Sequence, residues 1–362
     1  MKNPILIKNI PQKGFACFFG DDAGKKLLEF NAKGELSWQK KIDIQADNFH
    51  MLTSGSDIYL LTGNNHVAIR GWAAVNNEGD YALSTYHYDG TTAATHFELM
   101  DEGGNKLKVL KFDNDPVTGK PYIAGCIIDA NKEYKNTSGR ELSKGPYLGV
   151  FTIDINGSNP KAFKKAFTYW SDGSVSGVSE RGLFAETDSY VMFTNAFRDF
   201  DGNTYFAGPQ MIKKTRWGCI VSSVITAPLI VPPIWILGGV GLTKCKITDA
   251  MLAKQDAKGE FSVENSIPTD HSRYFRGGNA VAYFDNKKFY TVYDSDTKAD
   301  YLILDDEKNI TIYNVSKKQE VRTIPHKDGN LKTSIYPAKE GHVMVSQYNK
   351  KEKSTSVSIE FL

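Results

Sequence analysis

Residues 250–261 read Ala250-Met251-Leu252-Ala253-Lys254-Gln255-Asp256-Ala257-Lys258-Gly259-Glu260-Phe261, which is a strand-like run, a tight turn and the start of a second run. Aspartate or asparagine opens such a turn by hydrogen-bonding its own backbone, and glycine closes it because that position often needs a positive φ. The pattern recurs at Asn31 to Gly34, Asp101 to Gly104, Asp154 to Gly157 and, with a final asparagine, Asp306 to Asn309. A hairpin repeated at this scale predicts a repeat architecture.

A second pattern, G-x-x-Y-x-A-G, interleaves with these hairpins. It occurs at Gly119 to Gly125 and Gly202 to Gly208, with looser counterparts at Asp57 to Gly63, Asn286 to Tyr293 and Gly341 to Tyr348. Apolar residues alternate in the strand-like runs, and no segment of comparable length shows a capped helical stripe. Each unit therefore runs strand, strand, turn, strand, and six units follow one another.

The predicted fold is all-β: a single β-propeller over residues 1–362, six-bladed, with seven blades or an irregular β-sandwich as alternatives. Dividing 362 residues by six units gives about 60 residues each. A four-stranded blade takes roughly 40 to 50 residues, so insertions are expected. Residues 4–10 are expected to pair beside residues 354–362 and close the ring, which would remove the sheet edges.

The net charge and the N-terminal residues limit the possible partners and location of the protein. The chain has 44 basic and 42 acidic residues, a net charge of +2, so it has no global field that attracts nucleic acid, and nucleic-acid binding is not predicted. Residues 1–7 are too short a run, interrupted by Pro4 and followed by Lys8, to form a signal-peptide core. The protein is therefore expected in the cytoplasm, or outside it with its leader already removed.

Residues 217–243 form an apolar insertion within one repeat. The segment has no charged residue and is bracketed by lysine and arginine. The second G-x-x-Y-x-A-G starts 256−202=54 residues before its turn, against 154−119=35 for the first copy, which marks the segment as inserted. Pro228, Pro232 and Pro233 interrupt it, so a plain transmembrane helix is not expected.

Three interpretations of the insertion stay open. It is covered by the rest of the protein as a plug or lid, or it binds a partner, or it enters a membrane surface. The predicted contact residues are Trp217, Ile220, Val224, Ile225, Leu229, Ile230, Ile234, Trp235, Ile236 and Leu237.

The cysteines divide into two pairs. Cys219 and Cys245 are symmetric about Pro232, so a hairpin folded there would permit a disulfide in an oxidising compartment. Cys17 and Cys126 lie inside strand-like runs and are predicted to be small core residues.

Catalytic and metal motifs are absent from the sequence. It has no H-E-x-x-H, C-x-x-C, G-x-S-x-G or Walker lysine loop, and no cofactor is predicted. Acidic clusters at residues 113–115, 199–203 and 294–296 alternate oxygen ligands as a Ca²⁺ site does, but none has Gly at the sixth position with Glu at the twelfth. Turn formation is therefore the favoured interpretation, and no metal site is predicted.

With these strands and turns, the chain resembles the uncharacterised propeller-like proteins of Bacteroidota-type bacteria. The resemblance implies an exported protein, periplasmic or at the cell surface, with the cytoplasm as the alternative. The predicted function is a non-catalytic binding or scaffold module that contacts a protein partner or an envelope assembly. The alternatives are a glycan-directed hydrolase with carboxylates at the channel mouth, and membrane-surface docking through residues 217–243.

Overall fold

The computed structural model describes residues 6–21, 24–43, 46, 48–63, 67–70, 73–76, 81–91, 94–128, 147–173, 175–215, 243–269, 274–275 and 289–362. These residues form strands and turns, and their helical segments are two 3₁₀ helices, Pro160–Ala162 and Trp170–Asp172. The all-β prediction is therefore confirmed.

Contacts group the chain into two compact units. The first holds Met1–Val67, Asn76–Glu133 and Gly149–Thr168, and the second holds Ala68–Val75, Tyr134–Leu148 and Tyr169–Leu362. The assignment of residues 1–362 to a single domain stays a prediction.

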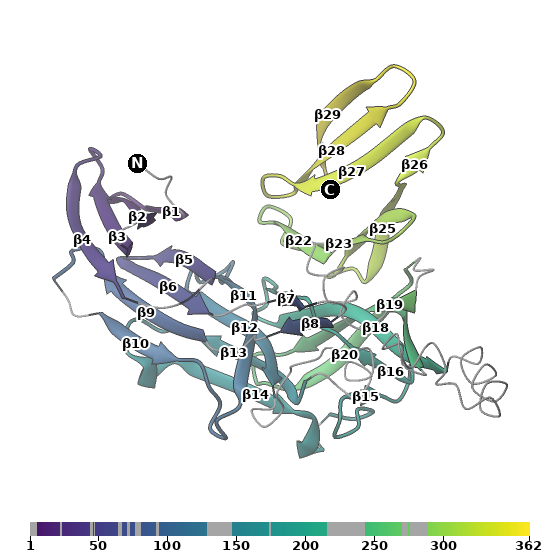
Figure 1. Ribbon diagram of the computed structural model, residues 1–362, viewed down its shortest axis with the longest axis horizontal. Helices are drawn as coiled ribbons and strands as arrows, with labels where there is room; N and C mark the ends of the chain where they lie inside the picture. The colour runs from purple at the N-terminus through teal and green to yellow at the C-terminus, as the bar shows by residue number, and fades with distance from the viewer. Residues whose placement is uncertain are drawn as a thin grey trace. The chain divides into compact units, whose positions relative to one another are not determined.

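The first unit contains three four-stranded antiparallel sheets (Figure 1). The first sheet has the order β1-β2-β3-β4, the second β10-β9-β6-β5 and the third β11-β12-β13-β14. Their bounds are β1 (Leu6–Ile10), β2 (Gly14–Asp21), β3 (Gly24–Asn31), β4 (Leu36–Ile42), β5 (Asn48–Ser54), β6 (Asp57–Gly63), β9 (Tyr81–His87), β10 (Thr95–Glu98), β11 (Lys106–Asn114), β12 (Pro121–Ile128), β13 (Gly149–Asp154) and β14 (Lys164–Tyr169). Outside these sheets, β7 (Val67–Arg70) pairs with β8 (Ala73–Asn76), and residues Ala68–Val75 of this pair belong to the second unit.

The second unit begins with a seven-stranded sheet, whose main path is β15-β16-β18-β19-β20, with β17 on β18 and β21 on β19. Two four-stranded sheets follow, β22-β23-β24-β25 and β26-β27-β28-β29. The bounds are β15 (Leu183–Phe184), β16 (Ser189–Val191), β17 (Asn195–Arg198), β18 (Thr204–Thr215), β19 (Thr243–Gln255), β20 (Phe261–Ile267), β21 (Tyr274–Phe275), β22 (Phe289–Asp294), β23 (Ala299–Asp305), β24 (Asn309–Asn314), β25 (Gln319–Pro325), β26 (Lys327–Asp328), β27 (Leu331–Pro337), β28 (His342–Asn349) and β29 (Ser354–Phe361).

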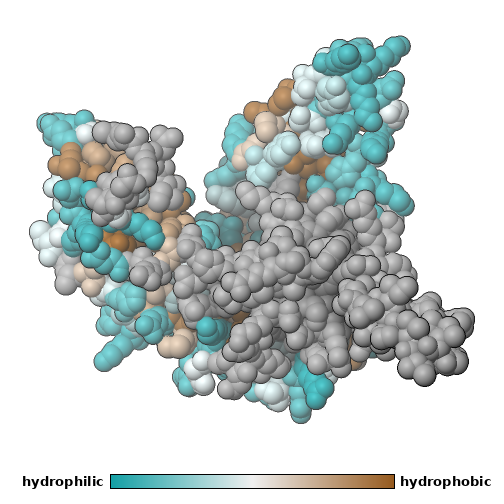
Figure 2. Space-filling model, in the orientation of Figure 1, coloured by the Kyte–Doolittle hydropathy of each residue, from teal (hydrophilic) through white to brown (hydrophobic). Residues whose placement is uncertain are grey.

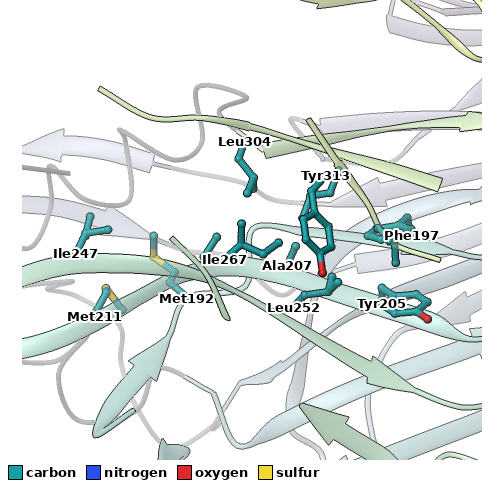
Figure 3. Packing of buried hydrophobic residues seen from close by; sticks show 13 residues of the cluster. Met192, Phe197, Tyr205, Ala207, Met211, Ile247, Leu252, Ile267, Leu304 and Tyr313 are labelled. Carbon is teal, nitrogen blue, oxygen red and sulfur yellow. The ribbon is translucent and has the colours of Figure 1, made fainter. Parts of the chain in front are cut away.

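Apolar side chains at alternate positions of the strands form the cores of the two units. In the first unit, Ala16 and Phe18 from β2 pack with Leu27 from β3 and with Ile58 and Leu60 from β6. Burying each large apolar side chain contributes about 1.5–3 kcal/mol relative to exposure. Figure 3 shows the corresponding cluster of the second unit, where side chains of β18 and β19 meet those of β23 and β24.

The predicted turns at Asn31 and Asp256 are confirmed. Asn31 Oδ1 accepts hydrogen bonds from the backbone N–H groups of Lys33 and Glu35 at 2.9 and 3.0 Å, and the Gly34 N–H donates to the Asn31 carbonyl. Likewise, Asp256 Oδ1 accepts hydrogen bonds from the backbone N–H groups of Lys258 and Glu260. These turns join β3 to β4 and β19 to β20, which are consecutive strands of one sheet.

Two other predicted hairpin turns are different in the structure. The strand β13 ends at Asp154, but β14 begins only at Lys164, because the intervening chain forms a 3₁₀ helix that starts at Pro160 and is capped by the Asn159 side chain. The turn at Asp101 does form, yet it leads from the last strand of the second sheet to the first strand of the third. A local turn motif therefore does not determine which sheet the next strand enters.

The predicted pairing of residues 4–10 with residues 354–362 is wrong for the strands that the structure describes. The strand β1 pairs with β2 and β29 pairs with β28, in different sheets. Each pair is a hairpin closed by a short turn. Closing a short turn costs less chain entropy than bringing two distant segments together. Local pairing therefore organises both ends.

Candidate interaction surface

The predicted contact residues lie outside the described part of the chain. This applies to all ten, from Trp217 to Leu237, and to Cys219. The backbone of Cys245 lies in β19, opposite Lys213 of β18 and Phe275 of β21. The disulfide stays a prediction. The core assignment of Cys17 and Cys126 is confirmed, since both side chains are buried.

The C-terminal sheet, β26–β29, has one face in the core. On this face Ile335, Val343 and Val345 pack in a hydrophobic cluster with Tyr301 and Ile312 of the preceding sheet. Val343 is fully buried. Period-two alternation then places the neighbouring residues of each strand on the opposite face.

That opposite face is apolar and exposed. The antiparallel register sets Tyr336 opposite Met344, and Met344 opposite Ile359, so these side chains form one row. Val357 and Phe361 share the face because each is two residues from Ile359. The exposed fractions of Val357, Ile359 and Phe361 are 61%, 64% and 64%. We name these five residues the C-terminal apolar face.

An apolar face of this kind needs an explanation. Single exposed apolar residues are ordinary, whereas a contiguous group marks an interaction surface or a surface covered by another element. Figure 2 shows brown, hydrophobic side chains among teal and white ones at the upper right, where Figure 1 draws this sheet. The C-terminal apolar face is therefore the candidate interaction surface of the described residues.

The acidic clusters are turn caps. Asp199 Oδ1 accepts from the backbone N–H groups of Asp201 and Asn203 at 2.9 and 2.8 Å, and its Oδ2 accepts from Asn203 Nδ2 at 2.9 Å. Asp115 accepts from backbone N–H groups of its own turn, and so does Asp294. Among the described residues, no group of three or more His, Cys, Asp or Glu side chains is arranged to hold a metal ion.

One carboxyl in the second unit is buried and has an oxygen without a hydrogen-bond partner. Asp300 of β23 is 2% exposed, and its Oδ2 has no hydrogen-bond partner. Burial, together with the charges of Asp199 and Asp201, raises the pKa of this carboxyl to about 7. The folded protein therefore disfavours the ionised form of Asp300. The sequence does not indicate this, because the three aspartates come together only in the tertiary structure.

An ion network links two sheets of the second unit. Glu264 of β20 lies 3.0 Å from Lys254 Nζ of β19 and 2.6 Å from Lys318 Nζ of the β24–β25 turn. Burial by itself would raise the pKa of Glu264, but hydrogen bonds from Lys318, Lys254 and Ser262 outweigh it and lower that pKa to about 2. The charged form of Glu264 is therefore favoured in the folded protein.

Replacing Glu264 with glutamine is expected to lower the free energy of unfolding by about 1–2 kcal/mol at pH 7, after allowance for the exposure of Lys318. Because the folded pKa of Glu264 lies below the unfolded value, the difference from wild type disappears as the pH falls from about 4.5 toward 2. Urea unfolding at several pH values measures this. Glu180→Gln, at an exposed site, is the control, and an equal effect there would contradict the prediction.

Comparisons with known proteins show similarity of structure without a family. No protein family model matches the chain, and no curated protein matches it. The solved structures that it resembles include a protein of unknown function from Bacteroides caccae, with 9% identity, covering 98% of this chain and 93% of that chain, and a TM-score of 0.38. They also include the Kuenenia stuttgartiensis hydrazine synthase, with 10% identity, coverage of 99% and 83% and a TM-score of 0.42, and the Dos1 propeller, with 9% identity, coverage of 99% and 72% and a TM-score of 0.40.

The class of the protein follows from its own sheets. Successive four-stranded antiparallel sheets along one chain are the units from which β-propellers are built, and the described residues contain such units from β1 to β29. The architecture therefore supports a β-propeller. No helix among the described residues is long and apolar enough to cross a membrane.

Proposed function

We propose that this protein is a six-bladed β-propeller that acts as a non-catalytic binding or scaffold module and contacts a protein partner. The six blades correspond to the six sheets of four or more strands that the described residues form in chain order. The exposure of the C-terminal apolar face is the observation that carries the binding role, because apolar side chains gain free energy when a partner removes them from water.

The described acidic residues do not favour the hydrolase alternative. A retaining or inverting glycosidase needs two carboxylates on either side of the glycosidic bond that it cleaves. Asp300 has the raised pKa of a general acid, but at 2% exposure a glycan does not reach it. Asp199, beside it, is occupied by the amides of its own turn. A binding role is therefore the better supported proposal.

The segment 217–243 is a second proposed contact surface, carried by its sequence. Its ten predicted contact residues, which are all apolar, and the flanking cations suit a protein partner or a membrane surface. A variant in which a short Gly/Ser linker replaces this segment distinguishes a protein partner from a membrane surface. In a vesicle flotation assay, a membrane role predicts that the intact protein floats with the vesicles and that the variant does not.

A photo-crosslinking residue at position 357 tests the binding role of the C-terminal apolar face. In cells of the source organism we expect a protein adduct of one defined mass, which excess unlabelled protein prevents. The matched control places the same residue at position 321, an exposed valine in the last strand β25 of the preceding sheet, where no such adduct is expected. Adducts of equal yield from both positions, or no protein adduct from position 357, would contradict the proposal.

A second measurement asks whether the face is covered within the chain. Replacing Val357, Ile359 and Phe361 together with threonine is expected to leave the melting temperature within about 3 °C of wild type, since exposed substitutions usually change stability by less than about 0.5 kcal/mol each. Val343→Thr and Val345→Thr, on the buried face, are expected to lower it strongly. Equal losses for both sets would mean that the C-terminal apolar face is part of the core.

A further inference from the structure

The strand β29 is an unprotected sheet edge. It ends the order β26-β27-β28-β29, so one side of its backbone has no partner strand among the described residues. Seven of its eight residues are exposed. An edge strand offers a row of unpaired N–H and C=O groups to any other strand, and natural proteins usually block such edges with lysine, proline or a bulge.

The last strands of three other sheets have this protection. Two adjacent lysines lie in β4, at Lys40 and Lys41, and another two in β14. The strand β25 carries charges and ends at Pro325. In contrast, β29 reads Ser-Thr-Ser-Val-Ser-Ile-Glu-Phe, without lysine or proline, and its one charged residue, Glu360, is paired with Arg322. The edge with the most exposed apolar face therefore has neither lysine nor proline to block it.

Charges near β29 distinguish between the two possible directions of an added strand. The turn before it contains Lys350, Lys351 and Lys353 with a single acid, Glu352, whereas Glu360 lies at its other end. Against a second β29, a parallel arrangement would bring the two lysine-rich turns together. An antiparallel arrangement separates these turns by the length of the strand and puts each one beside the Glu360 end of the other copy.

We propose that β29 pairs antiparallel with β29 of a second copy of this chain across a two-fold axis, so that two C-terminal sheets become one continuous sheet. This proposal rests on the proposed function, since it names a second copy of this chain as the protein partner. Cross-strand packing of Val357, Ile359 and Phe361 against the same residues of the other copy removes part of the C-terminal apolar face from water. Registers that set Val357 opposite Val357, Ile359 or Phe361 keep all the apolar side chains on one side of the joined sheet. A two-fold interface is self-complementary, and most soluble homo-oligomers are symmetric in this way.

Sedimentation velocity of the full chain from about 1 to 200 μM measures the association. We expect a monomer–dimer equilibrium in wild type, and at least a 100-fold higher dissociation constant for Val357→Lys, because the substitution acts twice in a two-fold interface. Val321→Lys is the matched control. Val321 is an exposed valine in the last strand β25 of the neighbouring sheet, and there the dimer is expected to persist.

Hydrogen exchange gives an independent readout of strand pairing. The amides of residues 354–361 are expected to exchange more slowly at 200 μM than at 1 μM in wild type, and at one rate in Val357→Lys. A wild-type protein that stays monomeric at 200 μM would overturn the proposal. A dimer that Val357→Lys leaves intact would also overturn it.

The outcomes separate this proposal from the proposed function. A monomeric protein that still gives a protein adduct from position 357 but not from position 321 retains the binding role and loses self-association. If Val357→Lys unfolds the chain, as judged by circular dichroism, while Val321→Lys does not, the C-terminal apolar face is covered within one chain and both proposals fail.

Discussion

Replacing Gly125 with alanine is expected to lower the free energy of unfolding by about 3 kcal/mol, although the change adds one methyl group. Gly125 ends the first G-x-x-Y-x-A-G motif and lies in β12. A Cβ atom there would lie 1.9 Å from the backbone oxygen of Lys108 and 2.9 Å from the Phe151 ring. The backbone of β11 would have to move away, which disrupts its pairing with β12.

A bulge explains the close approach. The register between β11 and β12 shifts between Val109 and Lys111, so one extra residue of β11 bends its backbone toward Gly125. Gly208 ends the second copy of the motif and is in the same situation, since its Cβ would lie 2.1 Å from the Met192 oxygen. Gly208→Ala is therefore expected to destabilise the protein by a similar amount.

Gly103→Ala is the matched control for both substitutions. Its Cβ would lie 3.3 Å from the end of the Asn105 side chain and 3.5 and 3.8 Å from the Asp101 carboxylate oxygens, with no backbone atom among these nearest contacts, and the position needs no positive φ. Alanine there is expected to be neutral, or to stabilise by up to about 1 kcal/mol through the unfolded chain. Urea unfolding measures all three variants. If Gly125→Ala and Gly103→Ala change the free energy of unfolding by the same amount, the backbone of β11 does not approach Gly125 as closely as the structure shows.

Replacing Asp300 with asparagine is expected to stabilise the protein at neutral pH. The folded pKa of Asp300, about 7, lies above the ordinary 3.8, so the folded state opposes ionisation. Wild-type stability is therefore fully present below about pH 4 and falls as the pH rises to about 7. A shift of about three units corresponds to about 4 kcal/mol, which is the upper limit of the gain from asparagine above pH 7.

The pH profile is the decisive part of this measurement. The difference between Asp300→Asn and wild type is expected to be near zero at pH 3.5, to grow between pH 4 and 7 and then to level off. Asp294→Asn, one strand away, is the control with the opposite sign. A hydrogen bond from Thr297 lowers the pKa of Asp294, so asparagine is expected to destabilise there. A gain at position 300 that does not depend on pH would contradict the assignment.

Local signals in the sequence predicted the secondary structure well. Each turn motif uses bonds within about five residues, so Asn31 and Asp256 behave as their sequence indicates. The fifth position of the motif was missed. Asn105 Nδ2 donates to Asp101 Oδ2 and Asn203 Nδ2 donates to Asp199 Oδ2, so a recurring asparagine there is a signal that the sequence carries. The turn at Asp154 was predicted wrongly because Asn159 and Pro160 favour a 3₁₀ helix just beyond it.

The candidate sites depended on cross-strand register instead. The sequence pointed to residues 217–243, which lie outside the described residues, and gave β29 no special role. In the sequence, Val357 and Ile359 show only the alternation that is typical of a strand. The pairing with β28 shows that their side chains lie on the face of the sheet that is not packed against the preceding sheet. Asp57 and His87 are 30 residues apart, yet the register of β6 and β9 brings Asp57 Oδ1 within 2.9 Å of His87 Nδ1.

The sequence alone therefore determined that this chain is all-β, where most of its predicted turns fall and which residues alternate, because these features depend on interactions between near neighbours. The tertiary structure decided which side of each strand is buried, why Gly125 and Gly208 must be glycine, and which aspartate carries a raised pKa. Those properties arise from atoms that belong to distant residues. Strand register and sheet packing bring these atoms together, and no local pattern specifies how.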